Sequence, residues 1–225
     1  MRLLLIPALA LTLATPALAD WQETLNSAKG QTVYWNAWGG DARTNAFIAW
    51  VGSETERIYG VKVEQVKLSD TAEAVARVIS EKSAGQDAGG SVDMIWINGP
   101  NFLSMKQQGL LHGPFVADLP NAQYLDLSAT SPASVDFTTP VEGFESPWRL
   151  AKFNFSYDSA RISDLPAGMA GWVDWAAAHP RRLTHPNPAN FMGATFLKQA
   201  LIELSPDPAV LQQPVTDEAY ATTTA

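Results

Sequence analysis

Residues 34–45 read YWNAWGGDARTN, and this stretch decides the fold class. Val33, Trp35 and Ala37 alternate as in a β-strand, and apolar residues recur at helical spacing after the double glycine. Glycines let the backbone turn sharply and approach a ligand closely, and a tryptophan beside them can supply a flat wall. The alternative is that Trp38 is a core residue next to an ordinary turn.

The order of strand and helix repeats twice more, with short connections, up to Gly109. Such an order implies right-handed crossovers and a parallel sheet flanked by helices, so we expect one α/β lobe. The third strand is a near-continuous apolar run, which suits a strand covered on both faces. The later predicted strands are 61–68 and 92–98; the first helix ends at Gly60, the second begins with a capping box at 70–73, and the third runs from about Asn101 to Gly109.

The pattern weakens after Gly109. We expect loops over 110–148, and an extended strand over 149–162 that crosses between two lobes. Beyond it we expect a helix over 171–178, a strand over 181–186 and a helix over 191–204. The predicted organisation is a first lobe over 20–150, followed by a hinge crossing and an incomplete second lobe over 151–225.

Residues 1–19 have the pattern of a cleavable secretory signal. Arg2 precedes an apolar run, and the small residues Ala17 and Ala19 place the cleavage before Asp20. The run is too short for a membrane anchor, which is the alternative reading. The chain contains no cysteine and therefore no disulfide. We expect a monomer free in the periplasm.

Charge excludes some partners. Loss of Arg2 with the signal leaves 14 basic against 23 acidic side chains, a net charge of −9. Nucleic acid and anionic membrane surfaces are therefore not expected as partners.

In an open parallel sheet, ligands bind beyond the carboxyl ends of the strands. The predicted loops there are 38–41 and 98–102. Motifs of hydrolases, zinc enzymes and nucleotide-binding enzymes are absent, and His112, His179 and His185 have no metal-ligand spacing. The sequence thus predicts no catalytic residue, no metal site and no cofactor.

Five motifs carry a resemblance to a known family: YWNAWGGD, VKLSDTAEAVARV, SVDMIWINGPNF, MKQQGLLHGPF and THPNPANFMGATFLKQA. Together they resemble the periplasmic solute-binding proteins of bacterial ABC transporters, in a branch related to the thiamine, polyamine and ferric-iron binders. The resemblance implies the two-lobed type II fold of that family. It also implies a small-molecule solute held between lobes and delivery to an ABC permease in the inner membrane. Members of the family are longer, so we expect that this chain is truncated at its C-terminus.

The resemblance also implies which residues neighbour the ligand. In the first lobe these are Trp38, Gly39, Gly40, Asp41, Asn98, Gly99, Asn101 and Phe102; in the second they are Asn187, Pro188 and Asn190.

The charge of the ligand stays open between two readings. Helix N-termini behind Gly40 and Gly99 could bind an anion. Asp41 would repel an anion, and tryptophan faces attract cations, so we favour a cationic or zwitterionic solute. The alternative function is a secreted, hydrolase-like enzyme that uses Asp41 and Asp93 as acid and base.

Overall fold

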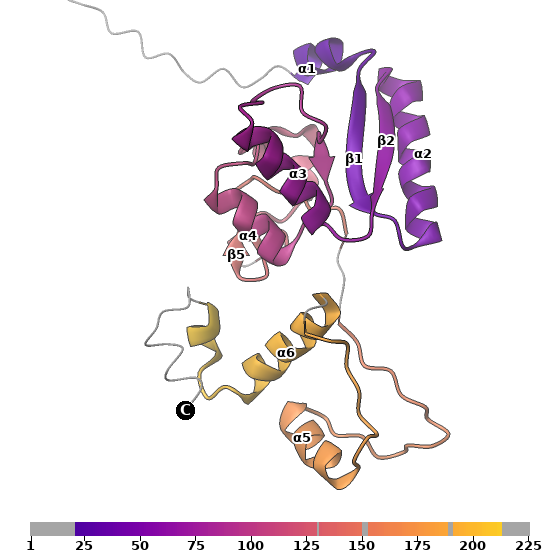
Figure 1. The fold of residues 1–225 in the computed structure, drawn as a ribbon, viewed down its shortest axis with the longest axis vertical. Coiled ribbons are helices and arrows are strands. Elements are labelled where there is room, and N and C mark those ends of the chain that lie inside the picture. The colour runs from indigo at the N-terminus through magenta and orange to yellow at the C-terminus, as the bar shows by residue number, and fades with distance from the viewer. Residues whose placement is uncertain (1–20, 130, 150–152, 189–190, 213–225) are drawn as a thin grey trace, which may run out of the picture. The chain divides into compact units, whose positions relative to one another are not determined.

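A computed structural model describes residues 21–129, 131–149, 153–188 and 191–212. The chain divides into two compact units after Ser146, whereas the sequence places a boundary after residue 150 (Figure 1). The predicted signal peptide and its cleavage site lie outside the described residues. Within the described ranges, no helix has the length and apolar character needed to cross a membrane.

The first unit is built on a three-stranded parallel sheet. Its strands are β1 (Thr32–Trp38), β2 (Lys62–Leu68) and β3 (Met94–Ile95), in the order β2-β1-β3. Thr32 pairs with Lys62 at one end of β1, and Trp38 pairs with Leu68 at the other. This confirms the predicted α/β class and parallel sheet.

β3 is shorter than the strand predicted over 92–98. Only Met94 and Ile95 form the ladder, and the amide of Trp96 adds a hydrogen bond of 2.9 Å to the carbonyl of Asn36. Just before the ladder, the carboxylate of Asp93 accepts a hydrogen bond of 2.8 Å from the amide of Tyr34. A side-chain oxygen thus binds the amide that a backbone carbonyl would bind in a longer strand. The expectation of cover on both faces was also wrong, because Met94 is 40% exposed.

Four helices precede residue 110: α1 (Trp21–Ala28), α2 (Ala42–Tyr59), α3 (Ala72–Ser83) and α4 (Gly99–Gln107). α2 ends at Gly60, which has the left-handed φ of 69° typical of a glycine cap. The predicted capping box forms at α3, where Glu73 accepts the amide of Asp70 at 3.0 Å and Asp70 accepts the amide of Ala72 at 2.8 Å.

α2 and α3 cover opposite faces of the sheet. The side chain of Gln65 bonds to Asn45 of α2, whereas Arg77 of α3 bonds to Asn36. Trp35 is the register partner of Gln65, and neighbouring residues of a strand point to opposite faces. In Figure 1, α2 runs beside β2, and α3 and α4 lie on the other side of β1.

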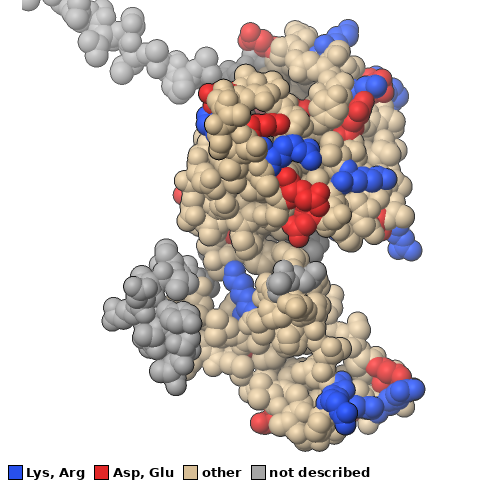
Figure 2. All heavy atoms as spheres, in the orientation of Figure 1, with Lys and Arg blue, Asp and Glu red and all other residues tan. Residues whose placement is uncertain are grey.

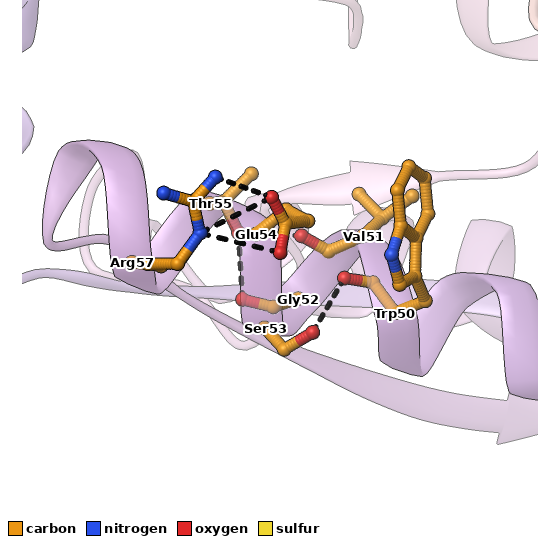
Figure 3. Close-up of polar contacts among 7 residues, drawn as sticks. All are labelled: Trp50, Val51, Gly52, Ser53, Glu54, Thr55 and Arg57. Atoms are coloured by element: carbon orange, nitrogen blue, oxygen red, sulfur yellow. Dashed lines mark hydrogen bonds and ion pairs between the residues drawn. The ribbon is translucent and has the colours of Figure 1, made fainter.

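The core of the first unit consists of apolar residues from these layers. Buried residues include Trp35, Ala37, Ile48, Leu68, Ala74, Val75, Phe102, Met105, Val116 and Val141. The outer face of α2 is different: Trp50 is 57% exposed, and Arg57 pairs with Glu54 at 2.6 Å one turn away (Figure 3). Such an exposed pair contributes little to stability.

Short elements complete the first unit. They are two 3₁₀ turns, η1 (Val116–Asp118) and η2 (Pro120–Tyr124), and a hairpin of β4 (Val135–Asp136) and β5 (Thr139–Pro140). The hairpin turn consists of Phe137 and Thr138, whose φ angles are 44° and 82°. Two positive φ values are required in a tight hairpin turn of this kind and are strained for residues other than glycine.

The second unit contains α5 (Met169–Ala178), α6 (Phe191–Leu204) and η3 (Pro208–Gln212). The two helices were predicted. The strands predicted over 149–162 and 181–186 do not form in the described parts of those ranges, because neither has a partner strand to share backbone hydrogen bonds. Instead, Phe155 stacks on Trp172 at a centroid distance of 5.6 Å and contacts Phe196 edge-on.

Candidate functional site

The strand order reverses at β1. The connection from β1 to β2 leads to one side of β1, and the connection from β2 leads back past β1 to β3. Ligands of open parallel sheets bind outside the carboxyl ends of the strands at such a reversal. Residues 38–41 follow β1 and residues 96–99 follow β3; we call them together the switch-point edge.

Trp38 lies at this edge with its ring folded over Gly40. An ideal Cβ built on Gly40 would lie 2.3 Å from Cζ2 and 2.5 Å from Cε2 of the indole. Only glycine leaves room for this arrangement. Trp38 is 42% exposed and meets Trp96 edge-on, with centroids 6.4 Å apart and planes at 74°. Trp38 is therefore not a buried core residue.

Gly39 is fixed by its neighbours. Its amide donates to the carbonyl of Leu68 at 2.9 Å, and a Cβ at this position would lie 2.8 Å from Cβ of Lys67. The side chain of Asn45 donates to the carbonyl of Gly39 at 2.8 Å, and Gln65 in turn donates to Asn45 at 2.9 Å. The loop after β1 is thus held by side chains from α2 and β2.

Asp41 is the N-cap of α2. Its carboxylate accepts the amides of Arg43 and Thr44 at 3.1 and 3.3 Å, and the hydroxyl of Thr44 at 2.6 Å. These bonds satisfy helix amides that would otherwise lack partners. The negative charge stays at the edge, at the positive end of the helix dipole.

On the β3 side of the edge, a carboxylate also binds an amide at the N-terminus of a helix, α4. Asn98 is the N-cap of α4 but makes no capping bond with its side chain. Gly99, at a left-handed φ of 57°, donates its amide to the carboxylate of Asp136 on β4. The sequence reasoning missed Asp136, and no local pattern signals it, because the two residues are 37 positions apart.

Glu145 was also missed. Burial, and secondly the negative charge of Asp136, raise its pKa to about 8. At neutral pH the Glu145 carboxyl is therefore mostly protonated, while Asp136 carries the hydrogen bond to Gly99. A glutamate in an irregular segment gives no signal of this burial in the sequence.

The remaining predicted ligand neighbours lie in α4 and in the second unit. Phe102 is fully buried in the core of the first unit, and its contact with a ligand stays a prediction. Asn101 is half-buried one turn into α4. Asn187 and Pro188 are exposed in the second unit, and Asn190 lies outside the described residues. The carbonyl of Asn187 lies only 2.2 Å from where a Cβ on Gly193 would be, which explains that glycine.

Asp93, considered as an acid or base, has a structural partner in the amide of Tyr34. Within the described residues, no cluster of three or more His, Asp or Glu side chains could hold a metal ion. Beside β3, the buried Asn36 accepts a hydrogen bond of 3.3 Å from Arg77. A buried amide needs such partners, so this pair fixes α3 on the sheet.

The electrostatics of the edge favour a positive group. Both helix N-termini that point to it, those of α2 and α4, already carry the carboxylates of Asp41 and Asp136. These charges compensate the dipoles that would otherwise attract an anion. Trp38, at the same edge, is 42% exposed, and aromatic rings attract cations.

Comparison with known proteins gives one informative similarity. Over 214 residues the chain is 42% identical to Protein YnjB of Escherichia coli (strain K12), an alignment that covers 95% of this chain and 54% of that protein. The chain thus spans about half the length of the curated relative it matches. No protein-family profile matches the chain, and no solved structure matches it.

Proposed function

We propose that the chain is the extracytoplasmic solute-binding component of an ABC-type import system. The observation that carries the proposal is the exposed ring of Trp38 at the switch-point edge, between two helices whose N-termini hold carboxylates. This arrangement offers an exposed aromatic side chain beside charged groups, which suits the binding of a small molecule.

The solute class follows from the same edge. An indole face beside Asp41 and Asp136 suits a small cationic or zwitterionic solute, because the ring quadrupole and the carboxylates attract positive charge. An anion would meet the carboxylates of Asp41 and Asp136 at the two helix N-termini. The side chain of Lys67, which lies against Gly39, is a positive group at the same loop.

Capture and delivery are parts of this proposal that rest on the family resemblance. The type II two-lobed fold, closure by hinge movement, and hand-over to a permease in the inner membrane belong here. Export to the periplasm rests on the pattern of residues 1–19. N-terminal sequencing of the exported protein should then begin at Asp20; recovery of intact Met1 from a membrane fraction would refute it.

A ligand panel tests the solute proposal. The chain is titrated with spermidine, putrescine, thiamine, choline and lysine, and separately with phosphate and citrate, at constant ionic strength. Tryptophan fluorescence and the midpoint of thermal unfolding are followed, since a ligand that binds the folded state raises the midpoint. The Trp38→Phe variant, which keeps an aromatic ring, is the matched control for Trp38→Ala.

The expected result is a saturable response to at least one cation or zwitterion that Trp38→Ala weakens and Trp38→Phe largely retains. Stabilisation by anions alone would reject the cationic class. A response that is the same in Trp38→Ala would reject the site.

A secreted hydrolase remains the second candidate, with a different pair of carboxyls from the one considered in the sequence. Asp41, Asp93 and Asp136 all accept backbone amides. Burial, and secondly the charge of Asp136, raise the pKa of Glu145 to about 8, and a carboxyl that keeps its proton at neutral pH can act as a proton donor. Turnover of nitrophenyl glycosides or esters that Glu145→Gln abolishes would favour this candidate over the receptor.

A further inference from the structure

A small pocket lies in the second unit beside the C-terminal end of α5. It encloses about 220 Å³, and the described residues that line it are Arg161, Ile162, Ser163, Asp164, Trp175, His179 and Arg182. Figure 2 shows basic side chains gathered at one end of this unit, next to acidic ones. In a chain with a net charge of −8, a pocket lined by two arginines and a histidine is unusual.

His179 is oriented by the last turn of α5. Its ring stacks on Trp175 with centroids 4.3 Å apart and planes at 19°, and its Nδ1 lies 2.8 Å from the carbonyl oxygen of Trp175. A carbonyl only accepts, so the hydrogen-bond network assigns a proton to Nδ1. Nε2 is then the ring nitrogen left for a ligand, and it donates a hydrogen bond when the imidazole is charged.

Neither arginine of the pocket is held in a strong ion pair within the described residues of this unit. Arg182 makes no ion pair within the described residues, and Arg161 contacts Asp158 through Nε at 3.2 Å. That pair is largely exposed and therefore weak. Arg181 precedes Arg182 with a left-handed φ of 66°, which turns the chain sharply after the helix, and Arg181 does not line the pocket.

We propose that this pocket binds the oxyanion group of a small molecule, a carboxylate or a phosphate. Guanidinium groups present parallel N–H donors that match the oxygens of either group. The volume is many times what one water molecule needs, so an oxyanion with a short substituent fits. Asp164 also lines the pocket and opposes a second negative charge, so singly charged anions bind best. The pocket belongs to a different unit from the switch-point edge, and the proposal does not depend on the solute-binding function.

Histidine resonances provide the test. The whole chain is titrated with sodium acetate and, in a separate arm, with inorganic phosphate near pH 6, where phosphate is mostly a monoanion, with chloride replaced to keep ionic strength constant. The Hε1 resonance of His179, assigned with His179→Gln, is expected to shift and saturate, while that of His112 does not. Saturation by one probe alone identifies which oxyanion the pocket takes.

Two neighbouring arginines give a matched pair of variants. Arg182→Gln should raise the dissociation constant about tenfold, the effect of losing one charged hydrogen bond. Arg181→Gln removes the same charge outside the pocket and should change it less than about twofold. Arg161→Gln serves if circular dichroism shows that Arg182→Gln does not fold. Equal weakening by the two variants, or a shift that chloride alone reproduces, would overturn the proposal.

Discussion

The indole ring of Trp38 occupies the space in which a Cβ atom on Gly40 would lie, 2.3 Å from the ring atom Cζ2. The position of the Trp38 ring therefore depends on the absence of a side chain at Gly40. The glycine lets the ring fold back over the loop, and the Trp38 residue remains 42% exposed. A change at position 40 should act on the site through Trp38.

Gly40→Ala should displace this ring. The added methyl group cannot share the space of the indole, so Trp38 must rotate, at a cost in unfolding free energy of about 1 kcal/mol. Near-ultraviolet circular dichroism should change, because the Trp38–Trp96 pair is disturbed. Gly168→Ala is the control, since a Cβ there meets only a glutamate oxygen at 3.7 Å. Unchanged spectra in Gly40→Ala would show that the ring is not fixed over the loop.

Trp38→Ala and Phe102→Ala should separate binding from stability. Loss of the exposed Trp38 ring should weaken binding of a cationic solute by about 1–2 kcal/mol. Loss of the fully buried Phe102 ring should lower the unfolding free energy by about 3–5 kcal/mol. Urea unfolding and ligand titration measure the two effects. If Trp38→Ala destabilises as much as Phe102→Ala, Trp38 belongs to the core after all.

Two substitutions of Asp41 separate the effect of its negative charge on ligand binding from its effect on stability as a helix cap. Asn caps a helix about as well as Asp, so Asp41→Asn should leave unfolding nearly unchanged, whereas Asp41→Ala should cost about 1 kcal/mol. Asp41→Asn should nevertheless weaken a bound cation, because the negative charge at the edge is lost. A cationic ligand that binds Asp41→Asn as tightly as the wild type would contradict the role of this charge.

The raised pKa of Glu145 predicts that the free energy of unfolding depends on pH. Its carboxyl keeps its proton up to a pKa of about 8 in the folded chain, against 4.5 ordinarily. Between these two pH values the folded state binds more protons than the unfolded state, so the unfolding free energy falls as pH rises through this window. Glu145→Gln removes the charge and should flatten this part of the profile. The profile is measured by urea unfolding, and identical slopes in the two proteins would disprove the burial.

Local signals explain what the sequence predicts well. The alternation in β1, the capping box at 70–73 and the stop at Gly60 all lie within a few residues of the elements they define. The extent of β3 depended on a side chain, Asp93, that pairs with a strand 59 positions away. Asp136 reaches Gly99 through a fold-level contact of the same kind, which no periodicity encodes.

In the second unit, the alternating sequence pattern predicted strands that do not form in the described residues. Residues 153–157 alternate as a strand does, but a strand exists only with a partner, and Phe153 and Phe155 pack on aromatic rings instead. The pocket residues Arg161 and Arg182 lie on either side of α5 in the sequence, and only the turn after the helix brings them together.

The central position of β1 also sets an order of folding. β1 pairs with β2 along its whole length, from Thr32–Lys62 to Trp38–Leu68, and α2 packs on β2. This βαβ unit is complete once residue 68 has been synthesised, before β3 exists. β3 then adds by two residue pairs to a surface already formed. Because β1 and β2 are nearer in sequence and share more residue pairs, we expect the first βαβ unit to form before β3 joins it, and the two-pair β3 ladder to open more readily than the β1–β2 ladder.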